Sequence, residues 1–230
     1  MFFLSINIKS IKKAIVIAGL SAAALLPSIS KIPESKEAMM PVENRTVVID
    51  AGHGGFDPGK EGSSGEDEQY INLKIASYLQ QYLEQSGASV IITRNDDSAL
   101  GDTKKSDMSE RRNIIEDSDA DITVSIHQNS FPSQNVHGAQ VFYYKDSEEG
   151  KKLAEYVQDA LIETLDNSNT RTAKANSDYY MLRTNSTPSI IVECGFLSNP
   201  SEEASLNSPD YQQKTAWAIY KGIIDYFHAE

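Results

Sequence analysis

The sequence has only one cysteine, Cys194, so no disulfide can form within the chain. The disulfide framework that stabilises many secreted domains is therefore excluded. Cys194 follows a run of β-forming residues, and it also follows Glu193, which suggests a cysteine nucleophile as an alternative. We expect a small buried core residue instead, because a cysteine in a buried strand is usually inert.

Positive charge is scarce. The chain has 33 acidic residues against 21 lysines and arginines, which gives a formal net charge of -12. Removing residues 1–30 takes away three lysines and no acidic residue, so the rest of the chain carries -15. Such a surface suits neither nucleic acid nor anionic lipid headgroups, and we expect no nucleic-acid partner.

A long apolar run is also missing. The longest uncharged apolar stretch is Ala14–Leu26, thirteen residues, which is short of the roughly 20 residues of a spanning helix. It follows Lys9, Lys12 and Lys13 and precedes small residues, the order of an export signal. We predict a Sec-type signal peptide over residues 1–30, with an uncleaved amino-terminal anchor as the alternative. Both place the rest of the chain outside the cytoplasmic membrane.

The remaining chain is expected to form one globular domain behind a short linker. Residues 31–44 contain Pro33 and Pro41 and mixed charge, which predicts a flexible tether. The folded domain should then span residues 45–230, and 40% hydrophobic residues are enough to build its core. The sequence shows no internal repeat and no low-complexity segment.

Strand and helix patterns alternate along this domain. Strand patterns occupy residues 47–50, 90–94, 122–126, 140–144 and 189–193, of which 140–144 is expected to be more exposed. Helical patterns begin at Glu68, at Ser109 as an N-cap, near Ser147 and at Ser208-Pro209. The alternation predicts an α/β domain with a mixed, mostly parallel twisted sheet and helices on both faces. Residues 167–185 are polar and poorly periodic, and we expect them to form a mobile rim over a site.

Four polar residues stand at the ends of these elements. His53 lies in a glycine-rich turn after the first strand, Glu68 opens a helix, and His127 and Glu193 close two further strands. The carboxyl ends of strands are where α/β sheets place their sites. Two histidines and a glutamate form a recurrent zinc triad, and a further glutamate is the acid/base of such zinc hydrolases.

Each of these residues also has a simpler interpretation. Glu193 could be a buried carboxylate paired with an arginine, and Glu68 could only stabilise the amino terminus of its helix. Asp50 could orient His53 or merely cap the turn. For His137 and His228 we expect surface positions.

The rim segment contains three residues that could touch a substrate. Tyr179, Tyr180 and Arg183 could bind glycan or peptide, or they could belong to an ordinary solvated loop.

Four sequence blocks, in this order, resemble the zinc-dependent N-acetylmuramoyl-L-alanine amidases of the amidase-3 family. The blocks are Asp50–Gly55, Glu68 with Asn72-Leu73, Ser125–Asn129 and Val192–Asn199, and the resemblance covers residues 45–230. It implies that His53, Glu68 and His127 bind one zinc ion and that Glu193 is the catalytic carboxylate. The substrate implied is the amide bond between N-acetylmuramic acid and L-alanine in peptidoglycan.

The chain also departs from the family pattern at two places. Gln69 stands where the family has a lysine, and Ile115-Glu116 stands where it usually has Ala-Asn, whereas Arg94 and Arg111 match family arginines. Neither departure touches a proposed ligand.

An export signal without carboxyl-terminal wall-binding repeats is similar to the sporulation-specific members, which trim spore-cortex peptidoglycan. No long insertion resembling the autoinhibitory helix of cell-division amidases separates His127 from Glu193.

Two other functions remain open at this point. The same triad and glutamate would serve a zinc peptidase acting on wall peptides. A non-catalytic peptidoglycan-binding module would keep the fold and lose a ligand or Glu193, and neither loss is seen. The sequence does not decide the oligomeric state, nor whether a protein partner is needed to complete the zinc site.

Overall fold

The computed structural model describes residues 42–229 except 64–65 and 185. The expected export signal and residues 31–41 of the expected tether lie outside the described residues. Val42, which we assigned to the tether, is fully buried against the core, so packing begins three residues before Arg45. No helix in the described part of the chain has the length and apolarity needed to cross a membrane.

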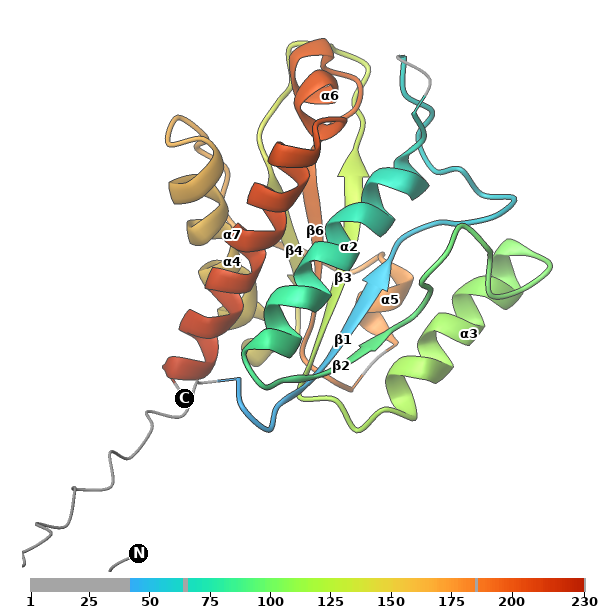
Figure 1. Ribbon diagram of the computed structural model, residues 1–230, viewed down its shortest axis with the longest axis vertical. Coiled ribbons are helices and arrows are strands. Elements are labelled where there is room, and N and C mark those ends of the chain that lie inside the picture. The colour runs from blue at the N-terminus through green and yellow to red at the C-terminus, as the bar shows by residue number, and fades with distance from the viewer. Residues whose placement is uncertain (1–41, 64–65, 185, 230) are drawn as a thin grey trace, which may run out of the picture. The chain divides into compact units, whose positions relative to one another are not determined.

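Six strands form one sheet in the order β2-β1-β3-β6-β4-β5 (Figure 1). Their bounds are β1 Thr46–Ala51, β2 Ser89–Ile92, β3 Ile122–Asn129, β4 Gln140–Tyr144, β5 Lys174–Asn176 and β6 Ser189–Phe196. Neighbouring strands run parallel except β4 and β6, which are antiparallel. The mixed, mostly parallel sheet is therefore confirmed.

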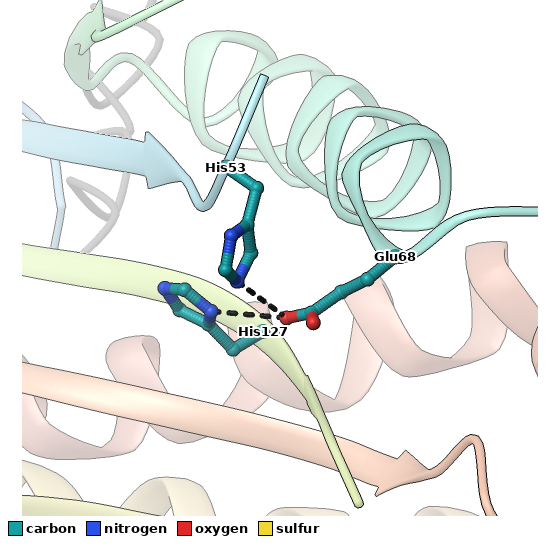
Figure 2. Close-up of side chains that lie close together, drawn as sticks. All are labelled: His53, Glu68 and His127. Carbon is teal, nitrogen blue, oxygen red and sulfur yellow. Dashed lines mark hydrogen bonds and ion pairs between the residues drawn. The ribbon is translucent and has the colours of Figure 1, made fainter. Parts of the chain in front are cut away.

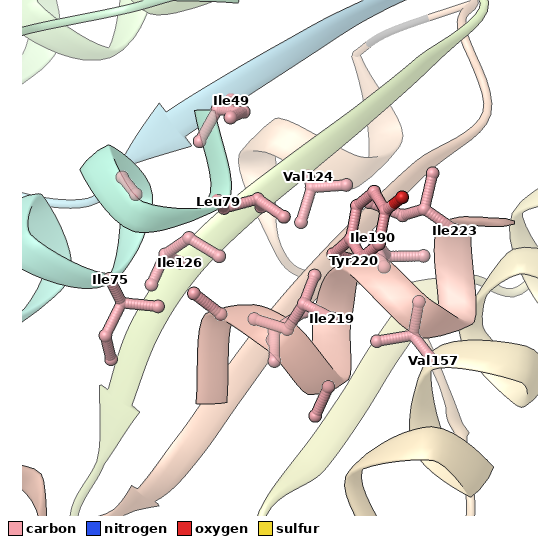
Figure 3. Packing of buried hydrophobic residues seen from close by; sticks show 14 of the residues in the cluster. Ile49, Ile75, Leu79, Val124, Ile126, Val157, Ile190, Ile219, Tyr220 and Ile223 are labelled. Atoms are coloured by element: carbon pink, nitrogen blue, oxygen red, sulfur yellow. The ribbon is translucent and has the colours of Figure 1, made fainter. Parts of the chain in front are cut away.

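Helices cover both faces of this sheet, as expected. Their bounds are α2 Glu68–Gln85, α3 Lys104–Glu116, α4 Glu148–Leu165, α5 Tyr180–Arg183, α6 Pro200–Leu206 and α7 Pro209–His228. Helices α2, α4 and α7 pack over one face, and α3 and α5 cover the other (Figure 1). The first face holds the large core, which Figure 3 shows between the strands and α2 and α7.

Successive side chains of a strand point to opposite faces of the sheet, and this decides on which face each polar residue lies. In β1, Val47 and Ile49 enter the large core, and Val48 packs on the other face against Ile115 of α3. Asp50 follows Val48 by two residues and therefore faces the α3 side as well. The same period in β6 places Glu193 on that face, between core residues Val192 and Cys194. The polar ends of the strands thus meet on the α3 and α5 side.

Helix α2 forms as the sequence predicts. Ile71, Ile75, Leu79 and Leu83 recur at four-residue spacing and are all fully buried. Gly87 follows the helix with a φ of +86°, the left-handed conformation that glycine adopts readily. Glu68 is thereby fixed at the first position of the helix, pointing toward the strand ends.

Helix α3 begins at Lys104, so the predicted start at Ser109 is wrong. The N-cap is Thr103, whose side chain accepts from the backbone of Ser106, while the Ser106 hydroxyl accepts from the backbone of Thr103. This capping box uses serine at its third position instead of glutamate, and the first turn carries two lysines instead of apolar residues. For both reasons the apolar period did not reveal the start.

Three short elements were missed, and one predicted strand ended too early. Strand β5 and helix α5 lie inside the segment that we expected to be irregular, and α6 follows an Asn199 N-cap with Pro200 at its first turn. Strand β6 continues past Glu193 to Phe196. The three missed elements have only three to seven residues, which is too short for a hydrophobic period to be recognised.

Candidate metal centre

His53, Glu68 and His127 converge at the carboxyl end of the sheet (Figure 2). Oε1 of Glu68 lies 3.2 Å from Nε2 of His53 and 3.0 Å from Nδ1 of His127. The three side chains each offer one ligand atom, and these atoms all lie within 4.8 Å of one another. The structure therefore brings together the three residues that the sequence selected, from a turn, a helix start and a strand end.

The carboxylate of Glu68 is held by more than the two imidazoles. Its Oε1 also accepts from the backbone N–H of Gln128 at 3.0 Å, and its Oε2 accepts from the N–H of Lys60 at 2.8 Å. Burial would raise the pKa of Glu68, but the bonds with His127 and His53 outweigh it and hold that pKa far below its usual range. Glu68 is thus an anion aimed between the two rings. It does more than stabilise the start of its helix.

The turn after β1 presents His53 in an unusual backbone conformation. His53 has a φ of +64°, and Gly54 follows at +135°. The far nitrogen of the ring, Nδ1, lies 3.0 Å from Oδ2 of Asp57, which also pairs with Lys104 at 2.9 Å. A carboxylate on one imidazole nitrogen leaves the other free to bind a metal. The sequence analysis did not single out Asp57, although its position four residues after His53 was a usable signal.

Two buried arginines hold the backbone of this turn. Arg94 donates to the carbonyls of Ala51 and Gly52 at 2.8 and 2.9 Å. Arg111 donates to the carbonyl of Ala51 at 2.7 Å and also to that of His53. The carbonyls that would otherwise lack partners in a buried turn are therefore satisfied. Both arginines therefore act on the backbone of the turn that carries His53.

Asp50 acts through Arg111 and does not contact the His53 ring. Its carboxylate accepts from Arg111 at 2.8 Å, from the Thr93 hydroxyl at 2.8 Å and from the Ser125 hydroxyl. Burial would raise the pKa of Asp50, but Arg111 and Ser125 outweigh burial and lower it to about 2. Of the two roles left open for Asp50, an indirect hold on His53 through Arg111 agrees with these bonds, and no capping bond to a backbone N–H is found among the described residues. Asp50 anchors the arginine that holds the turn.

Two glycines allow the ligands to approach. A Cβ on Gly52 would lie 2.2 Å from the His127 ring, and a Cβ on Gly59 would lie 2.7 Å from Oε2 of Glu68. Gly59 also has a φ of +75°. Side chains other than hydrogen are therefore excluded at both positions unless the ligands move.

Glu193 lies beside the triad on β6, paired in register with His127 of β3. Its side chain is buried, and among the described residues its Oε2 atom has no hydrogen-bond partner. Burial raises the pKa of Glu193 to about 7. The positive charge of His127 opposes this rise, and the negative charge of Glu68 adds to it. Within the described part of the chain it forms no ion pair with an arginine, so the structural alternative for Glu193 is not supported. An unpartnered buried carboxylate with this pKa is suited to proton transfer.

A half-enclosed pocket of about 180 Å³ opens onto these residues. His53, His127 and Glu193 form its floor, and Met108 of α3 and Met181 of α5 form part of its walls. Tyr179 and Tyr180 also line the pocket, while Arg183 does not. Residues of the expected rim therefore do border the site, but they do so on helix α5 and at its start.

The donor set fits zinc. Two imidazole nitrogens with one carboxylate are a known arrangement for catalytic zinc, which leaves one position open for water or substrate. Magnesium and calcium prefer shells made of oxygen alone, and this set has two nitrogen donors. The ionised carboxylate of Glu68 supplies the anionic donor of this set.

The remaining candidates lie where the sequence predicts. Cys194 is fully buried, and burial raises the pKa of its thiol, so it is a core residue and no nucleophile. His137 and His228 are both exposed. Ile115, one of the departures from the family pattern, packs in the small core under α3.

The sequence matches the Amidase_3 family, described as N-acetylmuramoyl-L-alanine amidase, over residues 47–225. It is 39% identical over 196 residues to the germination-specific N-acetylmuramoyl-L-alanine amidase of Bacillus subtilis (strain 168), covering 82% of each chain. It is 32% identical over 189 residues to the amidase LytC of the same strain, of which it covers only 36%.

Solved structures agree with these sequence relatives. The CwlD amidase from Clostridioides difficile, in complex with the GerS lipoprotein, superposes with a TM-score of 0.78 at 41% identity, over 81% of this chain and 100% of that one. The amidase AmiC2 of Nostoc punctiforme gives a TM-score of 0.72 at 36% identity, over 80% and 97%.

Proposed function

The chain belongs to the amidase-3 family of N-acetylmuramoyl-L-alanine amidases, and on that premise we propose that it cuts peptidoglycan with one zinc ion bound by His53, Glu68 and His127. The bond is the amide between the lactyl group of N-acetylmuramic acid and L-alanine. One observation carries this proposal. Glu193 lines the same pocket as His53 and His127 of the convergent triad, and its Oε2 atom has no hydrogen-bond partner among the described residues.

The protein residues have separate tasks in this reaction. When bound, zinc polarises the scissile carbonyl and lowers the pKa of a water molecule to about 7. Glu193 takes the proton of the attacking water at its carboxylate. It then delivers this proton to the nitrogen of L-alanine, because an amine leaves readily only when it is protonated. Asp57 contacts the His53 ring, Arg94 bonds to the carbonyl of Gly52, and Arg111 bonds to the carbonyl of His53. The turn that carries His53 therefore needs little rearrangement to bind the metal.

We infer that the substrate is spore-cortex peptidoglycan. The sequence relative at 39% identity is germination-specific, and a structural relative at 41% identity is the CwlD amidase. Action on the cortex requires a location outside the cytoplasmic membrane, which agrees with the predicted export signal in residues 1–30. The CwlD amidase was solved with a lipoprotein, and this supports a protein partner for the present chain too.

Product analysis tests the proposed function. Purified cortex peptidoglycan is incubated with the protein and zinc, and the products are identified by mass spectrometry. We expect free stem peptides with an L-alanine amino terminus, together with peptide-free muramic acid residues. A chelator should abolish both products. Cleavage inside the stem peptide would show a peptidase, and binding without any product would show a wall-binding module.

A further inference from the structure

A second hollow lies beside the segment whose Lys60 N–H bonds to Glu68. It measures about 470 Å³ and is formed by three segments: residues 60–63, residues 130–134 after β3, and residues 197–200 after β6. Its lining residues are Lys60, Glu61, Ser63, Ser130, Phe131, Pro132, Gln134, Leu197, Ser198 and Pro200. We call this hollow the Phe131 groove.

One lining residue of the groove contacts the proposed metal centre through its backbone. The N–H of Lys60, at its floor, donates to Oε2 of Glu68 at 2.8 Å. Ser130 and Phe131 follow His127 by three and four residues along the same strand end. The N–H of Phe131 donates to the Ser198 hydroxyl at 2.9 Å, which ties together the two loops that form the walls. A substrate centred on the metal ligands would therefore reach this groove.

The surface chemistry of the groove fits a sugar chain. Phe131 is 52% exposed, so the face of its ring is accessible to a ligand. Pro132 and Leu197 continue its apolar surface, and serine hydroxyls and the Gln134 amide surround it. A pyranose ring has an apolar C–H face that stacks on an aromatic ring and hydroxyls at its edge that need polar partners.

The shape of the substrate indicates which hollow would hold the glycan strand and which the stem peptide. A muramic acid inside a glycan strand continues in both directions, so the strand needs an open groove. The stem peptide has a free end and can enter a pocket that is closed at one end. The catalytic pocket is small and bordered by Met108, Met181 and Ile191, whereas the Phe131 groove is larger and lies between surface loops.

We propose that the Phe131 groove binds the glycan strand of the substrate, with the Phe131 ring stacked on a sugar. This inference rests on the proposed function for the identity of the substrate. It assigns the two sides of the scissile bond to two different hollows, sugar toward Phe131 and peptide toward α3 and α5.

Binding of peptide-free glycan chains tests the groove without any turnover. The probe is a set of chains of alternating N-acetylglucosamine and N-acetylmuramic acid, titrated into the full chain loaded with zinc. We expect Phe131→Ala to weaken binding about tenfold, as loss of an aromatic contact at a binding site commonly does. Phe131→Tyr keeps the ring and should bind like the wild type. Tyr156→Ala removes an exposed aromatic residue of α4 and should also leave affinity unchanged.

Kinetics on two substrates complete the test. Phe131→Ala should raise KM for the glycan-peptide polymer about tenfold with kcat retained, and a muramoyl dipeptide without further sugars should be affected less. Equal glycan affinity of wild type and Phe131→Ala would overturn the inference, while release of stem peptides by the same preparations would leave the proposed function intact. If the wild type releases no stem peptide, the proposed function fails, and the glycan titration still decides whether the groove binds sugar.

Discussion

Oδ2 of Asp57 lies 3.0 Å from Nδ1 of His53, across the ring from the Nε2 atom that faces Glu68. A carboxylate this close to Nδ1 favours the tautomer that carries its proton on Nδ1, which keeps the lone pair of Nε2 for a metal. Lys104, the first residue of α3, pairs with the same Asp57 oxygen at 2.9 Å. The orientation of one ligand is thus linked to the start of a helix about 50 residues away in the chain.

Asp57→Asn should weaken zinc binding by roughly ten- to a hundredfold, the usual effect of removing a partner of a ligating histidine. Competition with a chromogenic chelator measures this affinity. Asp146→Asn changes an exposed acid near α4 and is the control. Unchanged zinc affinity in the Asp57 variant would mean that its contact with His53 does not help this histidine to bind zinc.

Glu193→Gln should keep zinc and lose turnover. The amide has the size of the carboxylate but cannot accept a proton, so kcat should fall roughly 10²- to 10⁴-fold. Elemental mass spectrometry measures the zinc content of the protein, and release of stem peptides gives the rate. Glu155→Gln, on the surface of α4, controls for the loss of one negative charge. A wild-type rate in the Glu193 variant would remove this residue from the mechanism.

The pair of Asp50 and Arg111 predicts a loss of stability in acid. The pKa of Asp50 is lowered from 3.8 to about 2 in the folded protein, so its stabilising effect is complete above pH 4 and disappears as the pH falls through 2. This group alone should contribute about 2 kcal/mol to that decrease. Urea unfolding at several pH values measures it. Asp50→Asn should show a correspondingly smaller decrease between pH 4 and pH 2, and equal slopes for both proteins would contradict the assignment.

Gly52→Ala should disturb His127 without altering any ligand. The added methyl group would lie 2.2 Å from the His127 ring, so the ring or the turn must move, at a cost of about 1–3 kcal/mol. We expect lower zinc affinity and a lower Tm. Gly195→Ala, whose nearest neighbour would be 3.2 Å away, should have a smaller effect on both. Similar losses in the two variants would show that the ring position is not the reason.

Zinc should stabilise the fold through all three ligands. At a free zinc concentration of 100 times Kd, the gain in unfolding free energy should be about 2.7 kcal/mol, and a chelator should remove it. Calorimetry with and without zinc measures this difference. His127→Ala should abolish the zinc-dependent change in Tm, whereas His137→Ala, at an exposed position, should retain it. A change retained in the His127 variant would place the metal elsewhere.

The residues of the proposed metal site could be selected from the sequence because each one stands at a boundary that local patterns reveal. Val47–Asp50 reads as a strand and glycines follow it, so His53 falls at a strand end. Glu68 opens a strongly periodic helix, and His127 and Glu193 lie in β-rich runs. The sheet type followed from the same alternation of strands and helices.

The support around the ligands depends on contacts between distant segments and could not be predicted in this way. Arg111 reaches the carbonyl of His53 from 58 residues away, and no local pattern encodes that distance. The sequence singled out Asp50 but could not identify Arg111 as the residue through which it acts, for the same reason. Tyr179, the N-cap of α5, lines the pocket and packs against Phe142. A helix of four residues is too short to show a hydrophobic period, so the sequence did not reveal this element.

Cys194 sits next to Glu193 in β6 and is fully buried. A thiol reagent in solution can therefore react with it only when the central strand beneath the metal centre separates from its neighbours. Since the sequence contains no second thiol, every labelled molecule records one such opening. The native protein thus carries its own single-site probe of local unfolding, and labelling rates with and without zinc compare how often the empty and the loaded sites come apart.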